Sequence, residues 1–274
     1  MKLRGRVALI TGASSGIGLE VARQMVQQGG NVALIARSKD KLEATVRELG
    51  EARAAAFALD VTDRAALCAL PGQVKERFGR LDCVVNNAGT HHRGALRDRT
   101  PEEIAQMVET NLTAPMLLTR VALDVIEPDG VIVNVASLAG KVPVPNAATY
   151  SSTKFGLRTF GRALDLELRI AGVRVRVVTV SPGPVDTGFF GEDISRVTDL
   201  TFSQPMSSVE EVAAAVLRAM QDDDALEIDV PGPSGKLATM GYLSPRLYAM
   251  LRPMMERVGA RNKRRYQEQL RTRK

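Results

Sequence analysis

The sequence predicts an α/β fold in which one doubly wound, mostly parallel sheet is flanked by helices. Apolar runs of strand length alternate with helical patterns along the 274 residues, without an internal repeat or a linker. A glycine-rich segment at 11–18 follows the first apolar run, where a helical pattern begins. Further candidate binding residues follow later runs, and such sheets bind ligands beyond the carboxyl ends of their strands. We therefore expect a single domain with its ligand site at that edge.

The composition is typical of a water-soluble globular protein. Hydrophobic residues make up 45% of the chain and charged residues 25%. No window approaches the ~18 uninterrupted apolar residues of a membrane span, and the N-terminus lacks a signal-peptide layout. Cys68 and Cys83 offer neither a disulfide framework nor a metal-ligand spacing. We expect a cytoplasmic protein without a bound metal.

The positive charge is concentrated at the C-terminus. The formal net charge is +6, but residues 244–274 contain ten basic and two acidic side chains, a net +8. Residues 1–243 are therefore close to neutral, at −2. This distribution argues against a nucleic-acid-binding protein, and we expect no nucleic acid partner.

A phosphate-binding turn is predicted after the first strand, at residues 6–10. The segment Thr-Gly-Ala-Ser-Ser-Gly-Ile-Gly at 11–18 joins that strand to a helical pattern. Glycines let the backbone approach a pyrophosphate, and the free amides and dipole of a helix N-terminus favour its negative charge. The alternative is a plain tight turn, which does not explain three glycines at spacings of four and two. The residues expected to bind a nucleotide here are Gly12, Ser14, Ser15, Gly16, Ile17 and Gly18.

The end of the second strand, at residues 31–36, favours NADP(H) over NAD(H). An acidic residue at this position would bind the ribose of NAD, but Arg37 follows the strand instead. A guanidinium suits a 2′-phosphate, although Arg37 could also be a solvated loop charge. The third strand, at residues 54–59, ends in Asp60 and Val61. Asp60 is placed either to reach an adenine amino group or to cap the next helix.

A fourth strand at residues 81–86 runs into an Asn-Ala-Gly segment at 87–89. Asparagines at such a strand end brace neighbouring loops by bonding backbone groups. His91 and His92 lie beyond this segment in a polar loop without companion ligands. The two histidines could border a pocket, but we interpret both as solvated side chains that bind no metal.

Two polar residues are predicted close to the fifth strand, at residues 131–136. Ser137 follows this strand directly, and Asn111 lies within the preceding helical pattern at 101–126. A buried asparagine needs hydrogen-bond partners, so Asn111 is either bonded locally or functional.

Tyr150 and Lys154 begin a helical pattern that precedes a sixth strand at residues 173–180. Residues four apart share one face of a helix. An ammonium beside a phenol lowers the pKa of the phenol, which can then exchange a proton with an oxygen near neutral pH. Such pairs also occur by chance, so the pair alone is weak support for catalysis.

Taken together, these motifs resemble the short-chain dehydrogenase/reductase family, in its single-domain oxidoreductase branch. The resemblance covers residues 5–232 and implies a Rossmann-like fold. It rests on T-G-x-x-x-G-x-G at 11–18, N-N-A-G at 86–89, Asn111, Ser137, Tyr150, Lys154 and P-G-x-V-x-T at 182–187. Several motifs in this order are far more specific than any one of them.

The resemblance implies a role for each matching residue. Tyr150 would be the general acid/base, and Ser137 would bind the carbonyl or hydroxyl oxygen. Lys154 would contact the nicotinamide ribose and lower the tyrosine pKa, while Asn111 would hold a water in a proton relay. Further cofactor contacts are expected from Asn87, Ala88, Gly89, Tyr150, Lys154, Pro182, Gly183, Val185 and Thr187. The family also implies a homodimer or homotetramer.

The segment between residues 187 and 207 predicts a lid over an apolar pocket. It is rich in large apolar side chains, among them Phe189 and Phe190, and Val144 would form another wall. With Ser137, these three are the predicted substrate contacts. Ordinary core packing is the alternative for many of these side chains. A bulky, hydrophobic ketone, aldehyde or alcohol is the substrate we expect.

The C-terminal segment divides the chain into a catalytic part at 1–243 and a basic, amphipathic helical extension at 244–274. Apolar residues recur there at helical spacing, and Pro253 predicts a kink before a more basic helix at 260–270. The extension would pack on the body or a partner subunit, lie on an anionic membrane surface, or, as the least favoured alternative, meet an acidic carrier or nucleic acid.

These observations predict an NADP(H)-dependent oxidoreductase that interconverts a carbonyl and an alcohol, acting mainly as a reductase. A carrier-bound 3-oxoacyl reductase is the nearest enzyme alternative. From another class, the chain could be an NADP(H)-sensing regulator without catalysis, but loss of Tyr150 or Lys154 would then be expected, and both are present.

Overall fold

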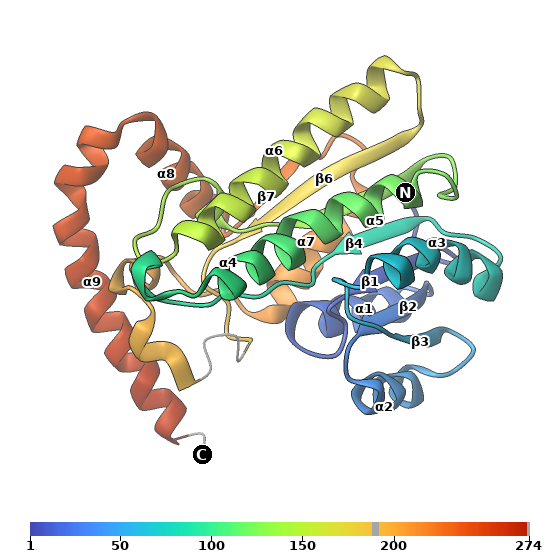
Figure 1. Ribbon diagram of the computed structural model, residues 1–274, viewed down its shortest axis with the longest axis horizontal. Helices are drawn as coiled ribbons and strands as arrows, with labels where there is room; N and C mark the ends of the chain where they lie inside the picture. Colours follow the sequence, from blue (N-terminus) through green and yellow to red (C-terminus); the bar gives the residue numbers. More distant parts are fainter. Residues whose placement is uncertain (188–191, 273–274) are drawn as a thin grey trace.

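The computed structural model describes residues 1–187 and 192–272 and confirms the predicted doubly wound fold (Figure 1). Seven strands form one sheet in the order β3-β2-β1-β4-β5-β6-β7, and every neighbouring pair is parallel. The strands are β1 (Val7–Thr11), β2 (Asn31–Ala36), β3 (Ala54–Ala58), β4 (Cys83–Asn86), β5 (Gly130–Val135), β6 (Val175–Pro182) and β7 (Glu227–Val230). The chain passes from β3 to β4 across β1, so the strand order reverses between β1 and β4. Ligands bind such sheets at this reversal point.

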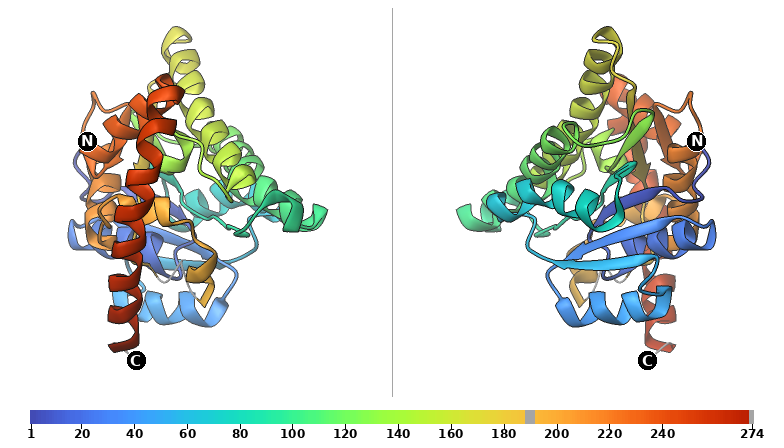
Figure 2. Two further views of the ribbon diagram at one scale, coloured as in Figure 1. Left: turned by 90° about the vertical axis from the view of Figure 1, so that its left-hand side faces the viewer. Right: turned by 90° about the vertical axis from the view of Figure 1, so that its right-hand side faces the viewer.

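Helices cover both faces of the sheet (Figure 2). They are α1 (Gly16–Gln27), α2 (Lys39–Leu49), α3 (Arg64–Phe78), α4 (Pro101–Val108), α5 (Ala114–Ala122), α6 (Ala148–Ile170), α7 (Val209–Gln221), α8 (Gly232–Leu243) and α9 (Pro245–Thr272). Alternate residues of β1 pack in the two cores on opposite faces of the sheet, because successive side chains of a strand point to opposite faces. Ala8 and Ile10 pack in the core that includes residues of α1, α2 and α7, whereas Val7 and Leu9 pack in the one that includes residues of α3, α5 and α6.

Two predicted helices differ from those observed. The single pattern at 101–126 is divided into α4 and α5 by a π-helical segment, Glu109–Thr113, which contains Asn111. The segment 260–270 is not a separate helix, because α9 continues through Pro253 and includes it, whereas the kink at Pro253 stays a prediction. A proline inside a helix removes one backbone hydrogen bond. Here the packing of the following turns against residues 197–203 offsets that loss.

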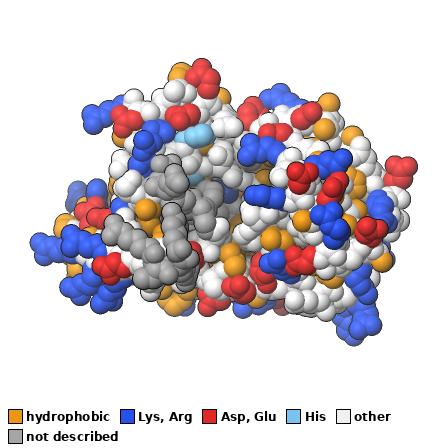
Figure 3. All heavy atoms as spheres, turned by 90° about the horizontal axis from the view of Figure 1, so that it is seen from below, with side chains coloured by type: hydrophobic (Ala, Val, Ile, Leu, Met, Phe, Trp, Pro, Cys, Tyr) orange, Lys and Arg blue, Asp and Glu red, His pale blue; other side chains and the backbone are white. Residues whose placement is uncertain are grey.

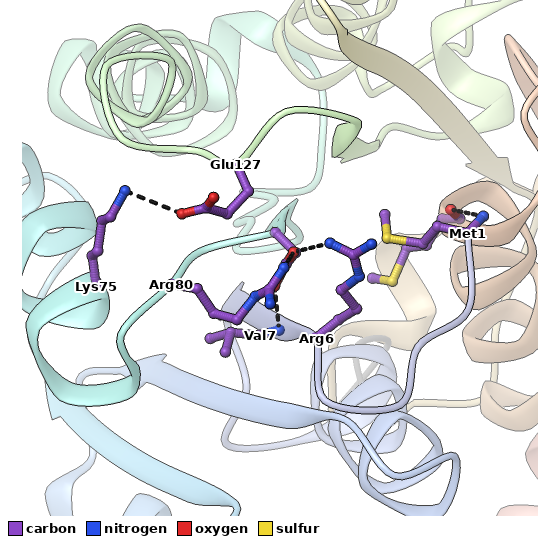
Figure 4. A network of polar contacts seen from close by, with 8 residues as sticks. Met1, Arg6, Val7, Lys75, Arg80 and Glu127 are labelled. Atoms are coloured by element: carbon purple, nitrogen blue, oxygen red, sulfur yellow. Dashed lines mark hydrogen bonds and ion pairs between the residues drawn. The ribbon is translucent and has the colours of Figure 1, made fainter.

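The buried carboxylate of Asp82 joins the start of β1 to the segment before β4 (Figure 4). It accepts hydrogen bonds from the Val7 amide at 2.9 Å, from Arg6 Nη1 at 2.6 Å, and from Arg80 Nε and Nη2 at 2.8 and 2.7 Å. Burial alone would raise the pKa of Asp82, but these hydrogen bonds outweigh it and hold the pKa below its ordinary value.

We expect Asp82→Ala to reduce the free energy of unfolding by about 3 kcal/mol at pH 7, because it leaves a buried amide and two guanidinium groups without their acceptor. The folded-state pKa is lowered, so this stabilisation is present above about pH 4 and is lost as the pH falls through the folded-state pKa. Urea unfolding at several pH values measures both effects. Asp124→Ala breaks an exposed 2.8 Å pair with Arg120 and should cost less than about 1 kcal/mol; equal losses would contradict the role of Asp82.

Candidate functional site

A cavity of about 1050 Å³ opens at the carboxyl ends of the strands. Most of the predicted site residues line it: Gly12, Ser14, Ser15, Gly16, Ile17, Arg37, Asp60, Val61, Asn87, Ala88, Gly89, Ser137, Val144, Tyr150, Lys154, Pro182, Gly183, Val185 and Thr187. Gly18 and Asn111 lie outside its wall. The predicted substrate contacts Phe189 and Phe190 lie outside the described residues.

The glycine-rich turn between β1 and α1 has the geometry of a phosphate cradle. Gly12 and Gly16 have φ angles of +68° and +55°, which favour glycine. A Cβ on Gly18 would lie 2.5 Å from the Gly12 carbonyl oxygen, so this glycine permits the close approach of α1 to the turn. Ser15, the N-cap of α1, forms no side-chain cap hydrogen bond. The first amides of α1 are therefore not satisfied by a cap, and the turn fits the pyrophosphate of a dinucleotide.

Hydrogen bonds fix this cradle to the loop after β4. The amides of Asn87 and Ala88 both donate to Thr11 Oγ1 at 3.0 Å. Asn87 Nδ2 donates to the Thr11 carbonyl oxygen at 2.9 Å. These contacts confirm that Asn87 braces neighbouring loops, and they set the position of Gly12 relative to the next wall of the cavity.

Arg37 and Asp60 lie at the end of the cavity formed by β2 and β3. Arg37 Nη1 is 3.9 Å from Asp60 Oδ2, and the arginine side chain is 76% exposed. Asp60 Oδ1 accepts hydrogen bonds from the amide and hydroxyl of Thr62. Asp63, and not Asp60, caps α3 by accepting from the Ala66 amide at 3.1 Å. Asp60 is therefore left on the cavity wall beside an accessible guanidinium.

Tyr150 and Lys154 project from the first turns of α6 into the opposite end of the cavity. Lys154 Nζ is buried, lies 5.8 Å from the centroid of the Tyr150 ring, and donates a hydrogen bond to the Val135 carbonyl oxygen at 3.0 Å. Burial lowers the pKa of Lys154 to about 8. The lysine can therefore exchange a proton close to neutral pH.

Burial also raises the pKa of Tyr150, against the opposing effects of a hydrogen bond with Ser137 and the positive charge of Arg93. The predicted lowering of the Tyr150 pKa by Lys154 is therefore not the dominant effect, because burial outweighs the groups that lower this pKa. Ser137 follows β5 and caps the short helix η3 (Leu138–Gly140) by accepting from the Ala139 amide at 3.1 Å. This contact fixes Ser137 in the cavity wall beside Tyr150.

Asn111 is fully buried in the π-helical segment and bonded locally. Its Oδ1 accepts from the Thr90 amide at 2.8 Å, and its Nδ2 donates to the Thr90 carbonyl at 2.9 Å and to Thr153 Oγ1 at 3.3 Å. Asn111 thus connects the loop after β4 to α6, one residue before Lys154. A π-helical turn often marks a functional site because it changes the register of the side chains that follow.

His91 is a residue whose role in the site the sequence did not predict. It is not a solvated loop residue: its ring stacks on Tyr150 with centroids 4.1 Å apart and planes inclined by 13°. Burial lowers the pKa of His91 to about 3, with smaller contributions from the charges of Arg93, His92 and Lys154. The ring is therefore neutral at physiological pH. Its Nε2 is buried without a hydrogen-bond partner among the described residues. The histidine is therefore a second polar group beside the tyrosine.

The buried Arg93 also lines the cavity, beyond His91 in the same loop. Neither His91 nor Arg93 belongs to a sequence motif. Their position in the site follows from the tertiary contact between this loop and α6. His92 lines the cavity as well, and its Nε2 pairs with Gln106 Oε1 at 2.6 Å. Within residues 1–187 and 192–272, no cluster of His, Cys, Asp and Glu has the geometry to hold a metal.

The C-terminal helix α9 packs against residues 197–203. Val197 and Phe202, the latter within the short helix η5 (Asp199–Ser203), form a small core with Tyr266. Tyr266 donates to Asp186 Oδ1 at 2.5 Å, and Lys263 Nζ lies 3.2 Å from Asp199 Oδ1. The inner side of α8 and α9 also contributes Leu237, Tyr248 and Met255 to the cavity wall.

Comparison with known proteins agrees with this architecture. A family model described as short chain dehydrogenase matches residues 6–197. A Streptomyces coelicolor protein named as a ketoacyl reductase is 42% identical over 187 residues, which are 66% of this chain and 71% of that protein. Dehydrogenase/reductase SDR family member 7B of Bos taurus is 30% identical over 268 residues, 91% of this chain and 81% of that protein.

Solved structures show the same fold. A short chain dehydrogenase from Burkholderia cenocepacia in complex with NADP has a TM-score of 0.75 at 29% identity, over 84% of this chain and 98% of that one. A short chain dehydrogenase/reductase from Burkholderia phymatum in complex with NAD has a TM-score of 0.79 at 23% identity, over 90% of this chain and 96% of that one. This second likeness concerns the fold alone. With the family model matching residues 6–197, the chain belongs to the short-chain dehydrogenase/reductase family.

Proposed function

We propose that this oxidoreductase uses NADP(H) to reduce a hydrophobic ketone or aldehyde, with Tyr150 as the general acid. The observation that supports this most is that Ser137, Tyr150 and Lys154 line one end of the cavity whose other end is the glycine cradle. A dinucleotide bound along this cavity would supply the hydride.

The side chains around Tyr150 would then direct the proton. Ser137 and Tyr150 would donate hydrogen bonds to the carbonyl oxygen, which gains negative charge as the carbon is reduced. The His91 ring stacks on Tyr150 and would help to orient the phenol. Lys154, with its pKa lowered to about 8, can return a proton toward Tyr150. The predicted water relay through Asn111 stays a prediction.

The preference for NADP(H) is part of the proposal. Arg37 is exposed at the end of β2 without a carboxylate at the position that would bind a ribose 2′-hydroxyl. The NADP-bound structure from Burkholderia cenocepacia supports this choice. Asp60, 3.9 Å from the guanidinium, would orient it toward the cavity.

A hydrophobic substrate is favoured by the apolar wall. Val142, Val144, Leu200, Leu237 and Met255 line the end of the cavity that the cradle does not occupy. The likeness to a protein named as a ketoacyl reductase favours a ketone and keeps a carrier-bound 3-oxoacyl group as the second candidate. Comparing a free long-chain ketone with a carrier-bound 3-oxoacyl thioester would separate the two. An NADP(H)-sensing regulator would bind the dinucleotide and turn over neither.

Oligomerisation also stays a prediction. Leu166 and Ile170 on α6 are 59% and 79% exposed, which is the kind of surface that a homodimer or homotetramer would cover.

Tyr150→Phe tests the acid role. We expect turnover with a carbonyl substrate and NADPH to fall about 10²-fold or more, because the proton donor is removed, while the affinity for NADPH changes less than about twofold. NADPH absorbance gives the rate, and NADPH fluorescence gives the affinity. Tyr242→Phe removes an exposed hydroxyl outside the cavity and should leave both unchanged. Near-normal turnover in Tyr150→Phe would reject the mechanism.

Arg37→Ala tests the cofactor preference. We expect kcat/KM for NADPH to fall about tenfold or more, and that for NADH to change little, because only the 2′-phosphate loses a charged partner. Arg47→Ala, an exposed arginine on the neighbouring α2 that does not line the cavity, is the matched control. Equal losses with both cofactors would show that Arg37 does not discriminate between them.

Lys154→Met tests the cost of burying an ammonium. The folded-state pKa of about 8 lies below the ordinary value of 10.5, so the unfolded chain binds more protons between these values and wild-type stability rises with pH across that range. We therefore expect the stability of wild type relative to Lys154→Met to rise from pH 8 to pH 10 in urea unfolding. Lys39→Met, at an exposed lysine, should show no such trend. A difference independent of pH would contradict the shifted pKa.

A further inference from the structure

The outer surface of α8 and α9 exposes an unusual number of large apolar side chains. Leu243 is 75% exposed, Met250 69% and Met254 60%. We call the whole set the apolar elbow: Met240, Tyr242, Leu243, Leu247, Met250, Met254 and Val258. The two helices lie together at one end of the molecule (Figure 1), so these residues form one region and not scattered exceptions.

Helix α9 has two apolar faces. Its inner face includes Met255, Gly259 and Tyr266, which lie against the cavity or the segment at 197–203. Its outer face presents Leu247, Met250, Met254 and Val258, spaced by three, four and four residues, which places them in one stripe. Packing on the body explains the inner face only. The outer stripe has no partner among the described residues.

Basic side chains surround this stripe. The outer face continues through Arg261 and Arg265, which are exposed, and Arg246 and Arg257 flank the apolar part. Residues 232–272 contain only two acidic side chains, Glu256 and Glu268, and Glu256 pairs with Arg252 at 2.7 Å. Figure 3 shows Lys and Arg side chains gathered with hydrophobic ones at the end of the molecule where α9 lies. Apposing this surface with a second copy of itself would bring like charges together, whereas an anionic surface would complement it.

The geometry points to a membrane surface and not a membrane span. Among the described residues, no helix is long and apolar enough to cross a bilayer. A helix with an apolar stripe bordered by arginines instead lies in the interface, with its apolar side chains among the acyl chains and its cations at anionic headgroups.

We propose that the apolar elbow and the arginines around it form a peripheral binding surface for anionic phospholipid bilayers. The same two helices contribute Leu237, Tyr248 and Met255 to the cavity wall. Docking through the elbow therefore places the cavity next to the phase in which apolar molecules dissolve. The proposal concerns binding and does not depend on the proposed reaction.

Flotation of the full chain with vesicles tests the proposal. We expect the protein to float with phosphatidylcholine vesicles that contain 30% phosphatidylglycerol, and at least tenfold less with pure phosphatidylcholine. Raising the salt from 0.05 to 0.5 M should weaken the binding severalfold, because the headgroup attraction is screened.

Two variants separate the apolar and basic contributions. Met250→Glu/Met254→Glu should reduce binding to the anionic vesicles about tenfold or more, and Arg261→Gln/Arg265→Gln severalfold. The matched controls are Leu96→Glu, an exposed apolar residue elsewhere, and Arg47→Gln/Arg218→Gln, which removes two exposed arginines from other helices. Both controls should bind like wild type, and thermal unfolding should show that every variant is folded.

Three results would overturn the proposal. The first is a wild-type protein that stays unbound at every concentration of anionic vesicles. The second is a loss of binding in the arginine variant with none in Met250→Glu/Met254→Glu, which would indicate general charge attraction. The third is a dimer, seen by light scattering, that Met250→Glu/Met254→Glu converts to monomer while flotation is unchanged, which would assign the elbow to a second copy.

Discussion

The close contact between the turn after β1 and the loop after β4 is the constraint on which the rest of the site depends. Thr11 accepts from two successive amides of that loop, and Asn87 returns a hydrogen bond to the turn. Two residues further along that loop, the amide and carbonyl of Thr90 are both hydrogen-bonded to the side chain of Asn111, which also reaches Thr153 on α6. These hydrogen bonds, together with the short backbone segment between residues 88 and 90, connect the phosphate cradle to the helix of Tyr150 and Lys154. The spacing between the two ends of the cavity is set by polar contacts within the protein, before any ligand binds.

The sequence predicted those parts of the fold and site that depend on local pattern. Strands β1 to β6 were predicted from apolar runs of a length that a buried parallel strand requires, and the glycines at 12, 16 and 18 indicated the cradle by their spacing. His91 could not be predicted, because its neighbour Tyr150 is 59 positions away and nothing in a polar loop indicates burial. The continuity of α9 through Pro253 also depends on tertiary contacts, since local propensity favours a break.

Several groups at the site are less stable where they are than they would be in water. Lys154 is buried and its pKa falls to about 8, His91 has a buried nitrogen without a partner among the described residues, and Tyr150 is desolvated. Burial of such groups costs free energy that the surrounding core must offset. Their concentration within one end of a single cavity supports the proposed reactive site, because perturbed titratable groups gather at functional sites.

The hydrogen bond between Tyr266 and Asp186 has a consequence for how such proteins diverge. Asp186 belongs to the segment that leaves β6, so the last turns of α9 brace the cavity from outside the sheet. A helix appended after the last strand can reshape the binding cavity while the strands that position Tyr150, Ser137 and the glycine turn stay unchanged. Specificity in this architecture can therefore change through the C-terminus, without altering the proposed catalytic residues.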